Sequence, residues 1–111
     1  MPIVEEEPAA ARLAGAEPVL IEFWAPWCGP CLKFHPVVEA LAERLGERVD
    51  VITVNTDECR TLPFEREVQS IPTLILFAGG EERARFAGRQ PLEELVLGIE
   101  RALAKRPEEN A

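Results

Sequence analysis

The chain has 111 residues, of which 47% are apolar, and a formal net charge of −8. This length suits one domain with one hydrophobic core, and no run approaches the roughly 20 apolar residues that span a bilayer. The acidic balance lacks the basic footprint of a nucleic-acid-binding protein and indicates a soluble, self-repelling surface.

The N-terminal segment carries the weakest pattern. Residues 1–7 are acidic and lack the apolar run of a secretory signal, which favours the cytoplasm. We expect a short edge strand around Ile3 and Val4. A short helix over 8–13 is expected to follow and to end at Gly15.

A buried strand and a long helix come next. Residues 19–24 form a compact β-type run, typical of a central strand covered on both faces, and Glu22 interrupts it. Residues 28–45 carry apolar side chains at helical spacing, and Gly46 marks the end of the helix. Pro36 lies inside this helix and removes one amide donor, which predicts a bend there.

The second half alternates strands and helices before a hairpin. Three strands are predicted over 49–54, 73–77 and 82–86. Two helices are predicted over 62–67 and 91–105. Gly79 and Gly80 supply the hairpin turn. With no repeats and no linker, the pattern indicates a single α/β domain over 1–111, a sandwich around a mixed sheet with frayed ends at 1–7 and 106–111.

Cys28 and Cys31 stand where the predicted strand gives way to the long helix. Three cysteines at these spacings are not a disulfide scaffold, and the sequence lacks a second pair for a four-ligand zinc site. The unpaired first amides of the helix and its dipole stabilise a thiolate at Cys28. Three residues make nearly one helical turn, so Cys31 lies within reach. We predict that Cys28 is the exposed nucleophile and that shielded Cys31 resolves the mixed disulfide.

Several motifs resemble those of one family. Trp27-Cys28-Gly29-Pro30-Cys31 resembles the active-site motif of the thioredoxin family residue for residue. Ile71-Pro72-Thr73 is similar to that family's cis-proline motif, and Gly88 falls on one of its later glycines. The resemblance runs from about Val19 to Ile99. It implies a thioredoxin-like three-layer sandwich, a mixed central β-sheet flanked by helices on both faces.

The resemblance also implies an activity and its partners. It implies a thiol-disulfide oxidoreductase that reduces protein disulfides through a Cys28/Cys31 dithiol–disulfide cycle, with neither cofactor nor metal ion. Client proteins and a thioredoxin reductase or equivalent donor are the implied partners of a monomer that binds neither nucleic acid nor membranes. The substrate-docking surface comprises Trp27, Gly29, Pro30, Ile71, Pro72 and Gly88. The Ile71 backbone, next to a cis bond, is expected to pair with an extended client segment.

Glu22 is the main departure from the family pattern. The family has a buried Asp there, which accepts the proton of the resolving cysteine, and the Lys that pairs with that Asp is replaced by Thr53. A buried Glu22 without a cation is expected to have a raised pKa and to act as a third catalytic residue, toward Cys31. The alternative is a carboxyl group that only finds hydrogen bonds.

Two further side chains are open to a chemical or a structural interpretation. His35 is the only histidine and follows Cys31 by four residues, on the same helix face. We favour a packed or solvated side chain there over a proton relay. We expect Cys59, near the start of the third helix, to be a structural or surface thiol without a regulatory role.

Two other functions stay open at this point. Glu22 and the segment Ala25-Pro26-Trp27 also resemble protein disulfide isomerase domains, so a more oxidising, isomerase-like oxidoreductase is the second hypothesis. The Gly29-Pro30 dipeptide favours a reductant instead. The third hypothesis is a binding module whose cysteines only regulate a partner interface.

Overall fold

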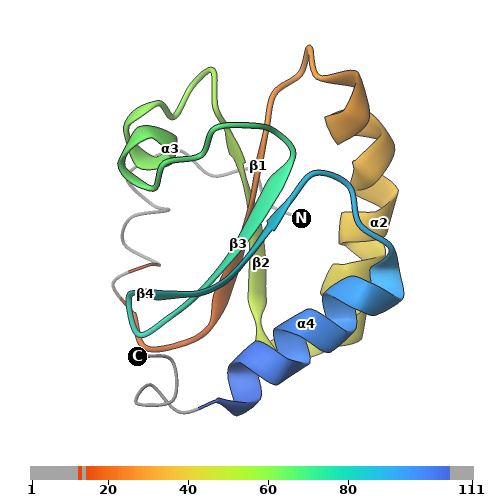
Figure 1. Ribbon diagram of the computed structural model, residues 1–111, viewed down its shortest axis with the longest axis vertical. Helices are drawn as coiled ribbons and strands as arrows, with labels where there is room; N and C mark the ends of the chain where they lie inside the picture. The colour runs from red at the N-terminus through yellow and green to blue at the C-terminus, as the bar shows by residue number, and fades with distance from the viewer. Residues whose placement is uncertain (1–12, 14, 106–111) are drawn as a thin grey trace.

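A computed structural model of the chain describes Leu13 and residues 15–105. The predicted edge strand around Ile3 and Val4 and most of the helix over 8–13 lie outside these residues. The described elements follow one another as β1 (Val19–Trp24), α2 (Gly29–Leu45), the short 3-10 helix η1 (Gly46–Arg48), β2 (Asp50–Asn55), α3 (Thr61–Glu65), β3 (Thr73–Ala78), β4 (Glu81–Ala87) and α4 (Leu92–Ala104) (Figure 1).

The described strands form one mixed sheet. Their order is β2-β1-β3-β4, so β2 and β4 are its outer strands. β1 runs parallel to β2 and antiparallel to β3, and β3 and β4 form the antiparallel hairpin. Four of the seven residues of β4 are charged: Glu81, Glu82, Arg83 and Arg85.

Helices cover both faces of the sheet (Figure 1). α2 and α4 lie against one face and α3 against the other. Successive side chains of a strand point to opposite faces, so β1 contributes side chains to the core on both sides of the sheet. Leu20 packs in the cluster that includes Phe34 of α2 and Ile99 of α4, whereas Phe23 packs with Leu62 of α3. The predicted three-layer sandwich is therefore confirmed.

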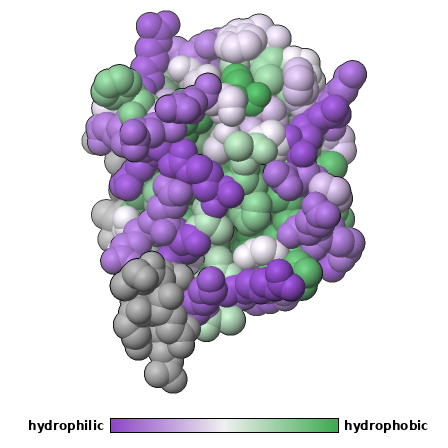
Figure 2. All heavy atoms as spheres, in the orientation of Figure 1, coloured by the Kyte–Doolittle hydropathy of each residue, from purple (hydrophilic) through white to green (hydrophobic). Residues whose placement is uncertain are grey.

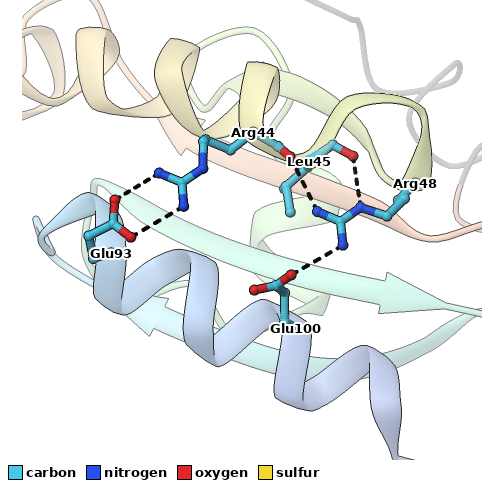
Figure 3. Close-up of polar contacts among 5 residues, drawn as sticks. All are labelled: Arg44, Leu45, Arg48, Glu93 and Glu100. Carbon is cyan, nitrogen blue, oxygen red and sulfur yellow. Dashed lines mark hydrogen bonds and ion pairs between the residues drawn. The ribbon is translucent and has the colours of Figure 1, made fainter.

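Ion pairs connect α2 and η1 to α4 across the surface (Figure 3). Arg44 donates to both carboxylate oxygens of Glu93 at 2.7 and 3.2 Å, and Arg48 donates to Glu100 at 3.2 Å. The Arg48 guanidinium also donates to the main-chain carbonyl oxygens of Arg44 and Leu45 at the end of α2. Arg48 thereby satisfies acceptors that a helix C-terminus leaves without intrahelical partners.

Two helix ends depend on backbone conformation. α2 ends at Leu45 because Gly46 adopts a φ of 59°, which glycine tolerates. The helix predicted over 62–67 is shorter than expected and ends at Glu65. Glu67 has a φ of 55°, in the left-handed region where a helix cannot continue.

Candidate active site

The turn between β1 and α2 carries both reactive cysteines. The Cys28 amide donates to the carbonyl oxygen of Ala25 at 3.1 Å, which closes this turn. Cys28 then occupies the N-cap position of α2, and its Sγ accepts a hydrogen bond from the Cys31 amide at 3.2 Å. The two sulfur atoms form a disulfide in this structure. The helix amide thus points at the sulfur that the sequence assigns as nucleophile.

The two cysteines differ slightly in accessibility. Cys28 retains 5% of its surface and Cys31 none. The order agrees with the prediction, but Cys28 is far less exposed than expected because Trp24, Ala25 and Ile71 pack around the pair. Gly29 and Pro30 are exposed at the helix N-terminus, and a Cβ placed on Gly29 would have no other atom within 4 Å. A client can therefore approach from this side.

Ile71 lies beside the cysteines, and Pro72 and Gly88 adjoin it. The Ile71–Pro72 peptide bond is cis, and the Ile71 carbonyl oxygen lies 3.9 Å from Cys28 Sγ. The Gly88 amide donates to the Pro72 carbonyl oxygen at 2.8 Å, which joins the end of β4 to the start of β3. Residues that are far apart in the sequence thus meet at one surface.

Trp27 directly precedes Cys28 and is exposed. Its side chain is 71% exposed, and its indole Nε1 donates to Oδ1 of Asp57 at 3.1 Å. Asp57 was not among the predicted site residues. The sequence nevertheless contained a signal for this contact. Trp27 follows β1 and Asp57 follows β2, and two parallel strands end at the same edge of the sheet. Figure 2 shows residues of intermediate hydropathy at the top of the view, where β1 leads into α2, between strongly hydrophilic flanks.

Glu22 is fully buried in the centre of the sheet. Its register partners are Thr53 on β2 and Leu74 on β3, neither of which is charged. Burial raises the pKa of Glu22 from 4.5 to about 8, because the charged carboxylate is the form that burial disfavours. Glu22 is therefore mostly protonated near neutral pH.

His35 lies next to Glu22. Its Nε2 is 3.5 Å from Glu22 Oε1. Its ring also meets the Trp24 ring edge-on, with 5.0 Å between centroids. Because the Glu22 carboxyl group is mostly neutral, this contact is not an ion pair between two charged groups. Helical spacing predicted that His35 lies near Cys31, but its distance from β1 depends on how α2 packs on the sheet.

Cys59 lies away from this site. It is buried and packs with Val54, Leu62 and Ile75 on the α3 face of the sheet. This position suits the expected structural thiol.

The described part of the chain has neither a cluster of metal ligands nor a membrane-spanning helix. No group of three or more potential metal ligands occurs within Leu13 and residues 15–105. No helix in the same residues is both long and apolar enough to cross a membrane.

Comparison with known proteins places the chain among thioredoxins. The family model described as Thioredoxin matches residues 3–101. Thioredoxin of Porphyra purpurea is 45% identical over 70% of this chain and 73% of its own. Thioredoxin M4, chloroplastic, of Arabidopsis thaliana is 43% identical over 79% of this chain but only 46% of its own. The chain thus spans about half the length of several relatives that it matches.

A solved structure agrees with the sequence matches. The crystal structure of chloroplastic thioredoxin z superposes with a TM-score of 0.83 at 25% sequence identity. The superposition covers 95% of this chain and 96% of that one.

Proposed function

Because this chain belongs to the thioredoxin family, we propose that it is a thiol-disulfide oxidoreductase that reduces protein disulfides through Cys28 and Cys31. The observation that carries the proposal is the disulfide at the N-terminus of α2, with the Cys31 amide directed at Cys28 Sγ. A helix N-terminus stabilises the thiolate that such exchange requires.

Two exchanges complete one turnover. The Cys28 thiolate attacks one sulfur of a client disulfide, and the other client sulfur leaves with the electron pair and takes a proton. Cys31 then loses its proton to the Glu22 carboxylate and attacks Cys28 Sγ. The Cys28–client bond breaks and the second client sulfur leaves as a thiolate. Two electrons pass to the client, and the Cys28–Cys31 disulfide remains.

Clients bind to the surface around the cysteines. Exposed Trp27, whose indole donates to Asp57, directly precedes Cys28, and Ile71 lies beside Cys28 Sγ and is followed by Pro72. The Ile71 main chain is next to Cys28 Sγ and supports pairing with an extended client segment, a form of strand addition. Gly29, Pro30 and Gly88 complete this docking surface.

A second protein must reduce the Cys28–Cys31 disulfide again after each turnover. We propose thioredoxin reductase or an equivalent dithiol donor, acting on a monomer without a cofactor. A reducing compartment such as the cytoplasm suits a dithiol that works in its reduced form.

Insulin reduction under dithiothreitol tests the activity. The wild type should accelerate precipitation of the insulin chains, and Cys28→Ser should abolish the acceleration. Cys59→Ala is the matched control because Cys59 lies in a different cluster from the active-site pair, and it should keep the activity. A wild type no faster than dithiothreitol alone would contradict the proposal.

An isomerase-like function is the second candidate, favoured by the Glu22 carboxyl group. Equilibration with glutathione separates the two. Known potentials are about −270 mV for thioredoxin and about −180 mV for protein disulfide isomerase. We expect a value near the former, moved upward by Pro30→His. A wild-type value near the latter would favour the isomerase.

A further inference from the structure

Four buried polar atoms without hydrogen-bond partners among the described residues gather at one place. They are Oε1 and Oε2 of Glu22, Nε1 of Trp24 and Nε2 of His35. An unsatisfied buried polar atom costs about 1–3 kcal/mol, so native proteins contain few of them. Such a cluster beside reactive cysteines calls for a chemical explanation.

The fold brings these side chains together with Cys31. Glu22 and Trp24 are two residues apart on β1 and therefore point to the same face. Cys31 and His35 are four residues apart on α2, which packs against that face. Trp24 contacts the Cys28–Cys31 cluster and the His35 ring. Glu22, Cys31 and His35 therefore belong to one microenvironment.

The His35 ring connects this interior to the surface. Nε2 is inaccessible to solvent and faces Glu22 Oε1 at 3.5 Å. The side chain as a whole is nevertheless 24% exposed. Its exposure therefore falls on atoms other than Nε2. The His35 side chain thus meets the buried carboxyl group at Nε2 and water at other atoms.

The residues that pair with Glu22 on the neighbouring strands are uncharged. β2 presents the Thr53 hydroxyl and β3 presents Leu74. From α2, His35 and the active-site cysteines lie near Glu22, whereas the other titratable side chains of the helix are exposed: Lys33, Glu39, Glu43 and Arg44. Burial raises the pKa of Glu22 to about 8, so most molecules hold a protonated Glu22 at neutral pH and need a route for that proton.

We propose that His35 is a positioning residue that relays the Glu22 proton between the buried carboxyl group and solvent. The inference rests on the proposed function and assigns a role that the sequence analysis disfavoured. Histidine suits the role because imidazole accepts a proton on one nitrogen and releases one from the other near neutral pH.

The relay restores Glu22 for each turnover. The carboxyl proton of Glu22 passes to His35 Nε2, and the ring gives up a proton to water on its exposed side. The resulting Glu22 carboxylate takes the proton of Cys31 as Cys31 attacks Cys28 Sγ. The leaving client thiolate takes a proton from water, so protons balance and the electrons follow the exchange already described.

Single-turnover kinetics test the relay. Reduced protein is mixed with a disulfide client, and decay of the mixed disulfide is followed between about pH 5 and 9, a range that includes the raised pKa of Glu22. His35→Gln should slow this step about tenfold near neutral pH, less than the 10²–10⁴ of a group acting directly. The deficit should shrink at the alkaline end. Glu39→Gln, an exposed change one turn further along α2, is the matched control.

Two readouts separate a relay from a packing role. Alkylation of Cys28 by iodoacetamide should be unchanged in His35→Gln, and added imidazole should partly restore the rate in His35→Ala. Equal pH profiles for the wild type and His35→Gln, or no response to imidazole, would overturn the relay. The proposed function would still hold if the wild type reduces insulin.

A measurement on the wild type covers the case in which neither variant folds. Carbon-13 NMR signals of the His35 ring should respond to the titration of Glu22, followed at Glu22 Cδ, because Nε2 lies 3.5 Å from Glu22 Oε1. Independent titration curves would exclude proton sharing.

Discussion

Glu22 of β1 and Thr53 of β2 are register partners in a parallel strand pair, and the hydroxyl group brings no positive charge to the buried carboxyl group. Thr53→Lys should place an ammonium group on the same face and lower the pKa of Glu22 from about 8. Carbon-13 NMR titration of the Glu22 carboxyl carbon measures the shift. Thr53→Val adds no charge and should leave the pKa raised. An unchanged titration in Thr53→Lys would contradict the electrostatic explanation.

Stability should depend on pH through Glu22. The folded chain keeps the Glu22 proton up to about pH 8, whereas the unfolded chain loses it near 4.5. Between these values the folded state binds more protons, so the free energy of unfolding falls as pH rises and levels off above about pH 8. The whole change is at most roughly 5 kcal/mol. Urea denaturation at several pH values measures it.

Glu22→Leu provides the matching variant for that pH dependence. Leucine removes the cost of a buried carboxyl group, so Tm should exceed that of the wild type, by more near pH 9 than near pH 5. Turnover should slow because Cys31 loses its proton acceptor. The same gain in Tm at both pH values would show that the carboxyl group is not the cause.

Trapping experiments should distinguish the two cysteines. Cys31→Ser leaves Cys28 at the helix N-terminus but removes the resolving thiol, so mixed disulfides with clients should accumulate. Cys28→Ser should trap none, because Cys31 is fully buried. Non-reducing gels with mass spectrometry give the readout. Equal trapping by both variants would reverse or abolish the assignment.

The Ile71 carbonyl oxygen lies 3.9 Å from Cys28 Sγ, so Ile71 is placed to contact any client segment bound there. Ile71→Lys puts a charge on an apolar docking surface. It should raise KM for insulin several-fold and affect a small aromatic disulfide much less, because the small molecule needs little docking. Parallel steady-state assays compare the two. Unchanged insulin kinetics would remove Ile71 from the docking surface.

Sequence patterns predicted the sheet more accurately than the contacts between layers. The strand over 19–24 matches β1 because a compact β-type run, even with Glu22 inside it, has few alternatives between turn residues. The end of α3 was missed because the left-handed conformation of Glu67 comes from its surroundings and not from a glycine. The contacts of His35 with Glu22 and of Trp27 with Asp57 were missed because each joins segments whose separation depends on tertiary packing.

Gly98 shows a similar dependence on packing. Glycine inside a helix costs about 1 kcal/mol relative to alanine, yet a Cβ on Gly98 of α4 would lie 2.9 Å from Phe86 Cε1 on β4. Gly98→Ala should therefore not raise the free energy of unfolding. In a Phe86→Leu background, the same change should become stabilising, and a double-mutant cycle by urea denaturation measures this coupling. A stabilising Gly98→Ala in the wild-type background would show that the ring moves freely.

The outer strand β4 has a consequence for how copies of the protein behave together. An outer strand offers main-chain donors and acceptors to any neighbouring molecule, which is how sheets polymerise. Here Glu81, Glu82, Arg83 and Arg85 place charge along that strand, and the whole chain carries a net charge of −8. Two copies meeting at this strand would have to strip water from those charges before their backbones could pair. The protein offers main-chain groups to clients beside Cys28. The charges on β4 disfavour the pairing of two copies through that strand.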